Sequence, residues 1–378
     1  MKLKNLLLFS LIFLFIASCG KKEDEVIKIG VILPLTGSVS EPGNKSLNGL
    51  KLAISLYNTY ETKHRIELII EDSQSDPKVG VNAINKLINF DAVKVIIGDL
   101  MSSVAMAIAP IAQRNKVVLF APGASNPLFT KEGNYIFRNW SSDNYDGIVM
   151  SNYILEIGLK RGSVIFINND YGVGLAEAFK ETFTKSGGDI LFYEGYKQGT
   201  NDFRSILLKL ARSKNLEFLY LVGQPQENGS LYKQLIEIGL KINIFANLSV
   251  ESPDFIKIVK SLPVPITYST PSYFPNKIIR DSLTFEMIYK EKYGTLPDVV
   301  AAHAFDAGNT TIQALKNSNF ELDKFRTALS LIKNFEGVTG LTSFTSEGDV
   351  VKEVFIKEIS STAIQKIIRR YSPNNSQN

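Results

Sequence analysis

The sequence predicts an α/β protein with two lobes, each built around a doubly wound parallel sheet. Short apolar runs rich in β-branched residues alternate with amphipathic stretches, and this alternation occurs in two successive series. Parallel strands covered on both faces have such apolar runs, and they need a crossover helix between them. A length of 378 residues also suits two hydrophobic cores better than one.

The first lobe is predicted from the first third of the chain. Its expected strands are the segments IKIGVIL, RIELIIED, VKVIIGD and VVLFAP. Apolar residues at three- and four-residue spacing predict helices over residues 47–60, 78–90 and 103–114. Each pair of consecutive strands is therefore joined by a helix, as a doubly wound unit requires.

A second series with the same architecture follows the segment IFRNWSSDN. The expected strands are SVIFIN, ILFYEGY, EFLYLVG and INIFAN, and the expected helices cover residues 144–159, 173–186, 203–213 and 229–239. Two later helices, over 277–293 and 298–317, and a hairpin-like segment after FEGVTG are expected to return to the first lobe. A chain that crosses between lobes more than once forms a hinge there.

The N-terminal segment is predicted to be an export signal. Lys2 and Lys4 precede an apolar run over residues 6–16, followed by small residues, which is the order typical of secretory signal peptides. We assign residues 1–18 to this signal. Its removal leaves 40 Lys and Arg against 38 Asp and Glu. Such a balance lacks the positive field that nucleic-acid binding requires, so we expect no nucleic-acid partner.

Cys19 is the only cysteine of the chain. Together with Ile16-Ala17-Ser18 before it, Cys19 resembles the lipobox of bacterial lipoproteins, which implies lipidation of this residue and residues 19–25 as a tether. The alternative is an incidental cysteine in an ordinary signal. If Cys19 carries lipid, no thiol is left for a disulfide, a redox site or a metal site.

Small residues and hydroxyls follow two neighbouring strands of the first lobe, in the segments GDLMSS and FAPGASNP. Ligands of open α/β sheets bind beyond the carboxyl ends of the strands. A helix that begins at Ser102 or Ser103 would add the positive end of its dipole. Ser125 and the small Gly123 let a ligand approach the next strand end. The site favours an anion, although helix capping alone also explains each serine.

The segment NDYGVGLAE opens a helix after a predicted strand of the second lobe. Gly172 and Gly174 suggest a dinucleotide fingerprint, but Glu177 stands where its third glycine would be, so a nucleotide site is not predicted. Tyr171 comes at the carboxyl end of the strand. It could lie over a ligand or pack in the core.

The sequence offers no catalytic or metal-binding constellation. His64 is expected in solvent and His303 as a half-buried packing residue, and neither has the partner spacing of a zinc site. Asp72 and Asp76 are explained by a strand end and a helix start. No G-x-S-x-G elbow occurs. We therefore expect neither an enzyme nor a cofactor.

Taken in order, several segments resemble those of extracytoplasmic solute-binding proteins of the branched-chain amino acid (Leu/Ile/Val-binding) type, which serve ABC importers. The segments are IKIGVILPLTG, EDSQSDPKVGVNAINKLI, VIIGDLMSS, APGASNP, FRN, NDYGVGLAEAF and FEGVTG…FTSEGD. The resemblance implies a type I periplasmic binding fold with three hinge crossings near Ser141, Thr270 and Leu341. It implies an N-terminal lobe of residues 26–141 plus 271–341 and a C-terminal lobe of residues 142–270 plus 342–372.

The resemblance also implies roles for individual residues. Ser102 and Ser125 fall where the family grips the ligand's carboxylate, and Gly123 falls where a backbone carbonyl meets its ammonium group. Tyr171 matches an aromatic residue that closes over the ligand, and Gln224 stands where amino-acid binders often have a tyrosine. Family members usually hold the ammonium with an acid just past the strand INIFAN. In this chain Leu248 or Ser249 falls there and Glu251 is displaced, so a ligand without an amine stays open.

We therefore expect a monomeric, lipid-anchored substrate-binding protein in the cell envelope. It would capture a small carboxylate-bearing solute, an amino acid or a related organic acid, and deliver it to an ABC permease. The alternative is a lipoprotein of the same fold that acts as a sensor or as a regulator of an envelope enzyme.

Overall fold

The computed structural model describes residues 25–37, 39–61, 63–259, 261–360 and 365–372. The predicted signal peptide, the predicted lipidation site Cys19 and the predicted tether lie outside these ranges, except for Glu25, which begins the first strand. No helix within these ranges is long and apolar enough to cross a membrane.

The first lobe contains a five-stranded, all-parallel sheet in the order β2-β1-β3-β4-β5. Its strands are β1 (Glu25–Leu33), β2 (His64–Asp72), β3 (Val95–Gly98), β4 (Val118–Ala121) and β5 (Ile136–Arg138). Its connecting helices are α2 (Ser40–Tyr60), α3 (Pro77–Asn89) and α4 (Ser102–Arg114). Ile29 and Val31 of β1 pack with residues of α2, whereas Ile32 packs with residues of α3 and α4. Both faces of the sheet are therefore covered, which explains the continuous apolar runs of its central strands.

The second lobe contains a seven-stranded sheet in the order β16-β15-β10-β9-β8-β6-β7. Its strands are β6 (Arg161–Ile167), β7 (Asp189–Tyr196), β8 (Phe218–Val222), β9 (Asn243–Ala246), β10 (Ile266–Pro271), β15 (Val354–Ile359) and β16 (Gln365–Tyr371). Its helices are α5 (Asp143–Glu156), α6 (Asp170–Lys185), α7 (Arg204–Leu210), α8 (Pro225–Glu237) and α9 (Pro253–Val259). The pairs β10–β15 and β15–β16 are antiparallel, and the other pairs are parallel.

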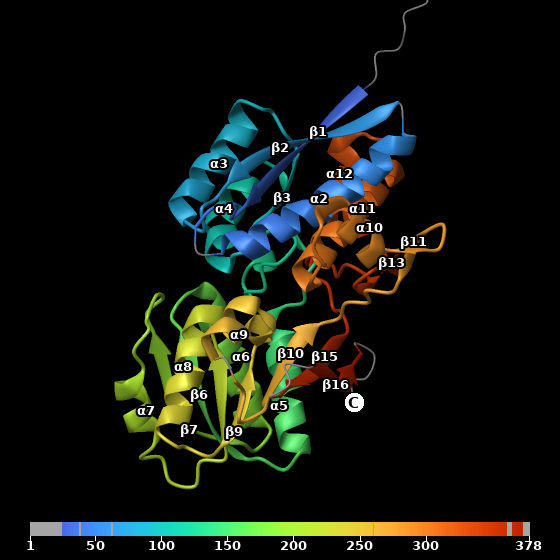
Figure 1. Ribbon diagram of the computed structural model, residues 1–378. Coiled ribbons are helices and arrows are strands. Elements are labelled where there is room, and N and C mark those ends of the chain that lie inside the picture. Colours follow the sequence, from blue (N-terminus) through green and yellow to red (C-terminus); the bar gives the residue numbers. More distant parts are fainter. Residues whose placement is uncertain (1–24, 38, 62, 260, 361–364, 373–378) are drawn as a thin grey trace, which may run out of the picture.

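Three late helices return to the first lobe, where the first two contact α2 and the third contacts the second (Figure 1). They are α10 (Phe285–Tyr293), α11 (Val299–Asn317) and α12 (Leu322–Ser330). Gly49 of α2 lets α11 approach closely, because a Cβ at this position would lie 2.1 Å from the carbonyl oxygen of Ala301 in α11. Tyr293 adds a hydrogen bond from Oη to the carbonyl oxygen of Asn48 (2.9 Å).

Most elements expected from the sequence are confirmed, with ends shifted by a few residues. The prediction of a helix over 277–293 is wrong in its first half. Residues 278–284 instead form a hairpin of β11 (Ile278–Arg280) and β12 (Leu283–Thr284). Asp281 and Ser282 at its turn have φ values of 41° and 71°, which an α-helix cannot hold. Helix α2 begins seven residues earlier than predicted, and α9 and α12 were not predicted.

The chain crosses between the lobes three times, after β5, after β10 and after β14 (Gly340–Thr342), the second strand of a hairpin with β13 (Phe335–Gly337). Hydrogen bonds link the crossing segments to one another. The backbone N–H of Lys352 donates to Ser141 Oγ (3.0 Å), and that of Ser272 donates to the carbonyl oxygen of Glu353 (2.9 Å). Ser272 Oγ also donates to the carbonyl oxygen of Thr339 (2.9 Å).

Candidate functional site

The two lobes touch where the strand ends of the first lobe meet the first turn of α6 (Figure 1). Asn126, in the loop after β4, donates a hydrogen bond from Nδ2 to the carbonyl oxygen of Asp170 (2.6 Å). Gly174 of α6 lies against this loop, because a Cβ there would be 3.0 Å from Pro127 Cδ. Ser102, Ser125 and Tyr171, three of the residues expected to bind ligand, lie around this contact.

The first-lobe part of the site joins the start of α4 to the loop after β4. Ser102 is the first residue of α4, and its Oγ accepts hydrogen bonds from the backbone N–H groups of Ser125 and Asn126, both at 3.3 Å. No side chain of the described residues caps the N-terminus of α4. The positive end of the helix dipole and two buried hydroxyls are thus brought together, which suits an anion.

Arg138 of β5 holds the loop after β4 in place. Its Nη1 donates to the carbonyl oxygens of Ala124 (3.4 Å) and Asn126 (3.0 Å), and its Nε lies 3.0 Å from Asp349 Oδ1. The guanidinium is buried and its charge is paired, so it supports the position of Ser125 without offering a free charge to a ligand.

The second-lobe part of the site is built around Tyr171, in the first turn of α6. Asn247 at the end of β9 donates from Nδ2 to Tyr171 Oη (2.7 Å) and to the carbonyl oxygen of Gly223 (3.0 Å). Asn247 Oδ1 accepts from Asn228 Nδ2 (3.0 Å). Burial raises the pKa of Tyr171 well above its usual value, so the phenol keeps its proton. Because Tyr171 Oη accepts from Asn247, its O–H remains able to donate to a ligand.

Two acids that were not predicted lie next to these groups, one helical turn apart at the start of α5. Asp143 is 2% exposed, and its backbone N–H donates to the carbonyl oxygen of Ser125 (2.9 Å). Asp143 Oδ2 and Asp146 Oδ1 are buried and have no hydrogen-bond partner in the described part of the chain. Burial raises the pKa of Asp143 to about 8 and that of Asp146 to about 6.

Further unpaired polar atoms lie close to Asp146. Tyr220 Oη on β8 and Ser269 Oγ on β10 are buried, and within the described residues neither makes a hydrogen bond of good geometry. The Asp146 carboxyl and the Ser269 hydroxyl are both near enough to Tyr220 to influence its pKa, which burial raises well above the usual value. Buried polar groups without partners cost free energy, so these atoms favour hydrogen-bond donors or a cationic group of a ligand beside Ser102 and Ser125.

The remaining predicted residues have different surroundings. Gln224 is the half-buried N-cap residue of α8, and Gly123 packs against Leu100. Glu251 ends the short 3₁₀ helix η2 (Leu248–Glu251), and its Oε1 accepts from Tyr268 Oη (2.8 Å) and pairs with Lys357 Nζ (2.6 Å). The structure therefore pairs Glu251 within the second lobe, whereas it brings Ser102, Ser125 and Tyr171 together through the interlobe contact.

Neither histidine lies in a candidate metal site, and no group of three potential metal-binding side chains occurs among the described residues. His303 is fully buried rather than half-buried as expected, and its ring centroid lies 4.5 Å from that of Trp140. His64 is half-buried and stacks on Phe320, rather than extending into solvent as expected.

The sequence places Asp143 and Asp146 near a helix start and Asn247 at a strand end, but such positions have more than one explanation. Acids in the first turn of a helix commonly stabilise its dipole, and an asparagine at a strand end commonly begins a turn. Only their surroundings beside Tyr171 distinguish them from such residues, because Asp143 and Asn247 are buried and Oδ1 of the half-buried Asp146 is enclosed.

Comparisons with known proteins agree with this architecture. The Leu/Ile/Val-binding protein homolog 3 of Brucella melitensis is 30% identical over 233 residues, a match that spans 61% of this chain and 63% of that protein. The Leu/Ile/Val-binding protein homolog 2 of Brucella abortus is 28% identical over 331 residues, or 85% of this chain and 87% of that protein. The crystal structure of the leucine binding protein LivK from Thermotoga maritima superimposes with a TM-score of 0.84 at 28% identity, covering 92% of this chain and 99% of LivK.

The family model of the periplasmic binding proteins matches residues 26–363, nearly the whole described chain. The fold class expected from the sequence is confirmed by this match and by the likeness to LivK. The relatives are binding proteins of transporters and not enzymes. This chain belongs to the periplasmic binding protein family.

Proposed function

We propose that this chain is the substrate-binding protein of an ABC importer and that it captures a small carboxylate-bearing solute between its lobes. The observation that carries this proposal is the position of Ser102 and Ser125, buried together at the uncapped start of α4 where the lobes touch. Hydroxyls and backbone N–H groups in a dry cleft bind a carboxylate through charge-assisted hydrogen bonds.

We assign the other groups of the site by their surroundings. The Tyr171 O–H would donate to the solute from the second lobe, and the Gly123 carbonyl would accept from it. Gln224 would face the solute from the start of α8. Glu251 has the weakest support as a ligand residue, because its carboxylate is already paired with Lys357.

We propose hinged closure of an N-terminal lobe (26–141 plus 271–341) on a C-terminal lobe (142–270 plus 342–372). The three bonded crossings support this motion, because short hydrogen-bonded connections can bend together. We further propose a monomer in the cell envelope, anchored through lipid on Cys19 and delivering its solute to a permease. Metabolic labelling with a palmitate analogue should label the unchanged protein and not the Cys19→Ala variant.

The binding proposal is tested by a thermal-shift screen of amino acids, keto acids, aromatic acids and short peptides, followed by calorimetry. A solute that binds only the native state raises the melting temperature. The variant with both Ser102→Ala and Ser125→Ala should lose at least tenfold in affinity, whereas Ser186→Ala, on the exposed end of α6, should not. Undiminished affinity in the double variant would show that the anchor is wrong.

The alternative role as a sensor or regulator makes a different prediction for partners. Affinity capture from detergent-solubilised membranes should return the subunits of an ABC permease if the transport role is right. Capture of an envelope enzyme or a sensor kinase, without a permease, would favour the alternative.

A further inference from the structure

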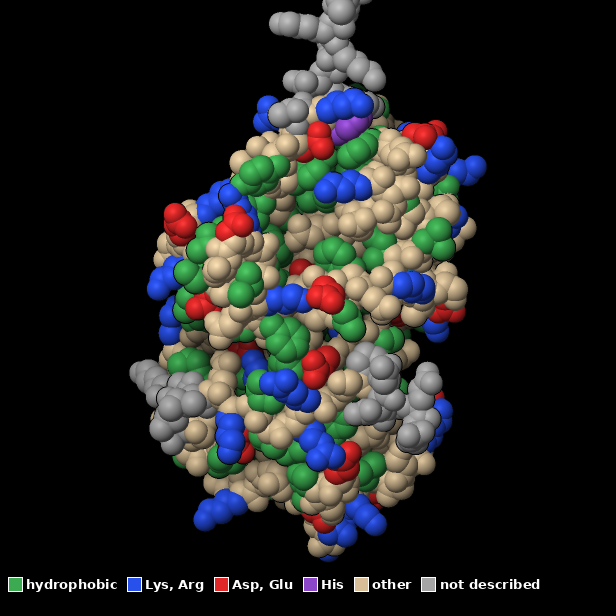
Figure 2. All heavy atoms as spheres, turned by 90° about the vertical axis from the view of Figure 1, so that its right-hand side faces the viewer, with side chains coloured by type: hydrophobic (Ala, Val, Ile, Leu, Met, Phe, Trp, Pro, Cys, Tyr) green, Lys and Arg blue, Asp and Glu red, His purple; other side chains and the backbone are tan. Residues whose placement is uncertain are grey.

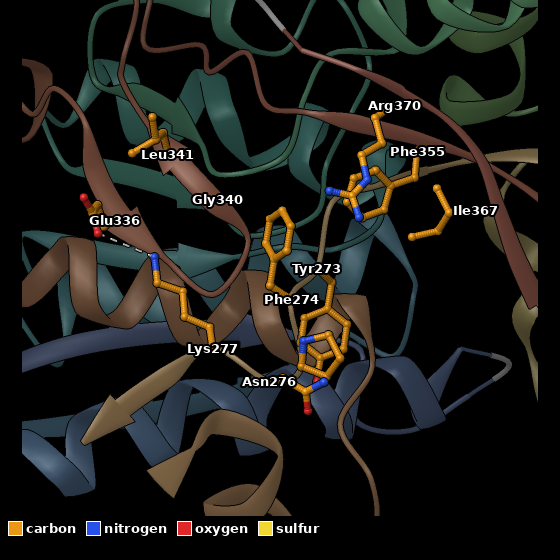
Figure 3. Close-up of a pocket in the computed structure, with 11 residues that line it drawn as sticks. Tyr273, Phe274, Asn276, Lys277, Glu336, Gly340, Leu341, Phe355, Ile367 and Arg370 are labelled. Atoms are coloured by element: carbon orange, nitrogen blue, oxygen red, sulfur yellow. Dashed lines mark ion pairs between the residues drawn. The ribbon is translucent and has the colours of Figure 1, made fainter. Parts of the chain in front are cut away.

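A pocket of about 590 Å³ lies beside the hinge crossings, and none of the residues that line it belongs to the proposed solute site. Phe274, after the second crossing, lies in the middle of this pocket, with Leu341 on one side and Phe355 and Arg370 on the other (Figure 3). The volume falls within the range of about 300–1,000 Å³ that is typical of small-molecule sites. The pocket is independent of the proposed solute site.

The walls of the pocket come from both lobes. Leu341 belongs to the β13–β14 hairpin of the first lobe, and Phe355 and Arg370 belong to β15 and β16 of the second lobe. The backbone N–H of Phe274 donates to the carbonyl oxygen of Val338 (2.9 Å), which ties the second crossing to the β13–β14 hairpin. A molecule in the pocket would therefore contact both lobes at the hinge.

The lining is largely apolar and partly exposed to water. The rings of Phe274 and Phe355 meet edge to face with centroids 5.7 Å apart. Leu341 is 57% exposed and Ile367 is 41% exposed, although both are large apolar residues. Figure 2 shows hydrophobic side chains between the lobes on this side of the molecule, with charged side chains around them. An aromatic molecule would cover this apolar surface and make ring contacts with the two phenylalanines.

The charges of the pocket favour an anion. The Arg370 guanidinium lies 5.1 Å from the centroid of the Phe355 ring. Burial raises the pKa of Glu353 and the charge of Arg370 opposes this rise, but Arg370 forms no close ion pair with any of the described residues. Lys277 Nζ is 3.8 Å from Glu336 Oε2, and the Glu336 side chain is 77% exposed, so this pair is weak. Both cations can therefore turn to an incoming carboxylate or sulfonate.

We propose that this hinge pocket is a second binding site, and that its ligand is an aromatic anion. The ring of the ligand packs against Phe274 and Phe355, and its anionic group pairs with Arg370. Because the bound molecule would contact both lobes, the site lies where a ligand can bias their relative position.

The probe for this site is 1-anilinonaphthalene-8-sulfonate, an aromatic sulfonate whose fluorescence rises on binding. The unchanged protein should show saturable, one-site binding. Arg370→Gln removes the cation and Leu341→Glu places a negative charge at the rim, so each should weaken binding at least fivefold. The matched controls are Arg326→Gln, which also removes an arginine lying over an aromatic ring, and Leu331→Glu, which also changes an exposed leucine. Both controls should bind as the unchanged protein does.

Circular dichroism and melting curves identify any variant that has lost its fold and exposes apolar surface nonspecifically. Non-saturable binding by the unchanged protein, or unchanged affinity in either folded pocket variant, would overturn the proposal. The Ser102→Ala and Ser125→Ala double variant should retain probe binding. Loss of binding there would mean that the probe occupies the interlobe site, which also contradicts the proposal.

Discussion

Asn126 of the first lobe donates a hydrogen bond to the backbone carbonyl of Asp170 in the second lobe, over 2.6 Å. This bond joins the loop that carries Ser125 to the first turn of α6, which carries Tyr171. The two halves of the proposed solute site are therefore held together by a contact that exists only when the lobes are close. A bound solute and this hydrogen bond should therefore each stabilise the closed arrangement of the lobes.

We expect Asn126→Ala to weaken closure. A hydrogen bond of this kind contributes about 1 kcal/mol, so solute affinity should fall about fivefold, mainly through faster dissociation. The measurement is surface plasmon resonance with a solute identified in the screen. Asn115→Ala is the control, because among the described residues Asn115 Nδ2 bonds only to the carbonyl oxygen of Ile111, one turn earlier at the same helix end. Equal dissociation rates for Asn126→Ala and the unchanged protein would show that this bond does not secure the closed form.

We expect Asp143 to make the solute-free protein less stable as the pH rises from about 4 to about 8. In the unfolded chain the carboxyl loses its proton near pH 4, whereas burial keeps it protonated in the folded protein up to about pH 8. The unfolded state binds fewer protons in this window, so the free energy of unfolding falls with rising pH, by at most about 1.4 kcal/mol per unit.

Asp143→Asn removes this titration. Its melting temperature should exceed that of the unchanged protein by several degrees, roughly 3–6 °C, at pH 8, and by much less at pH 5. Melting curves across this range check the result, with the exposed Asp202→Asn as control. A difference that stays constant with pH would contradict the assignment of the titration to Asp143.

We expect Asp143 to favour solutes that carry an amine. A protonated amine beside Asp143 Oδ2 would supply the partner that this buried oxygen lacks. An amino acid found in the screen should therefore bind at least tenfold more tightly than the carboxylic acid that lacks only its amine, and Asp143→Asn should remove this preference. Calorimetry of both compounds with both proteins measures this difference. Equally tight binding of the two compounds would exclude the amine preference but leave the carboxylate site intact.

We expect the buried pair at the third hinge crossing to matter for stability. Asp306 accepts hydrogen bonds from the backbone N–H groups of Val338 (3.0 Å) and Thr339 (2.8 Å), and Lys352 Nζ donates to Thr339 Oγ1 (2.6 Å). Burial lowers the pKa of Lys352 to about 8, against the attraction of Asp306. Asp306→Ala leaves this cation without its acid, so the free energy of unfolding should fall by about 3–5 kcal/mol.

Urea denaturation measures this loss. Adding Lys352→Met to Asp306→Ala removes the unpaired charge and should recover part of the stability. If Lys352→Met recovers nothing in the Asp306→Ala background, the loss comes from the hydrogen bonds to Val338 and Thr339 rather than from the charge.

The positions of Ser102 and Ser125 could be predicted because strand ends have local signatures. Ser102 and Ser125 follow apolar runs, and the carboxyl ends of neighbouring parallel strands lie at one edge of a sheet. Asp143 and Asp146 were missed because acids in a first helical turn have an ordinary explanation. Glu251 was placed at the site from its position after β9, but its partner Lys357 is 106 residues away in the chain and no local pattern reveals that pair.

The sequence alone determined the order of most strands and helices and the location of the strand ends that we propose to bind an anion. These features depend on the period of apolar residues and on the small residues that follow each strand, which are local properties of the chain. Only the tertiary structure decided that Asn126 reaches Asp170, that Asp143 Oδ2 is buried without a hydrogen-bond partner among the described residues, and that Glu251 is paired. Such contacts join residues that are distant in sequence, and their energies depend on the exclusion of water, which only the packed lobes provide.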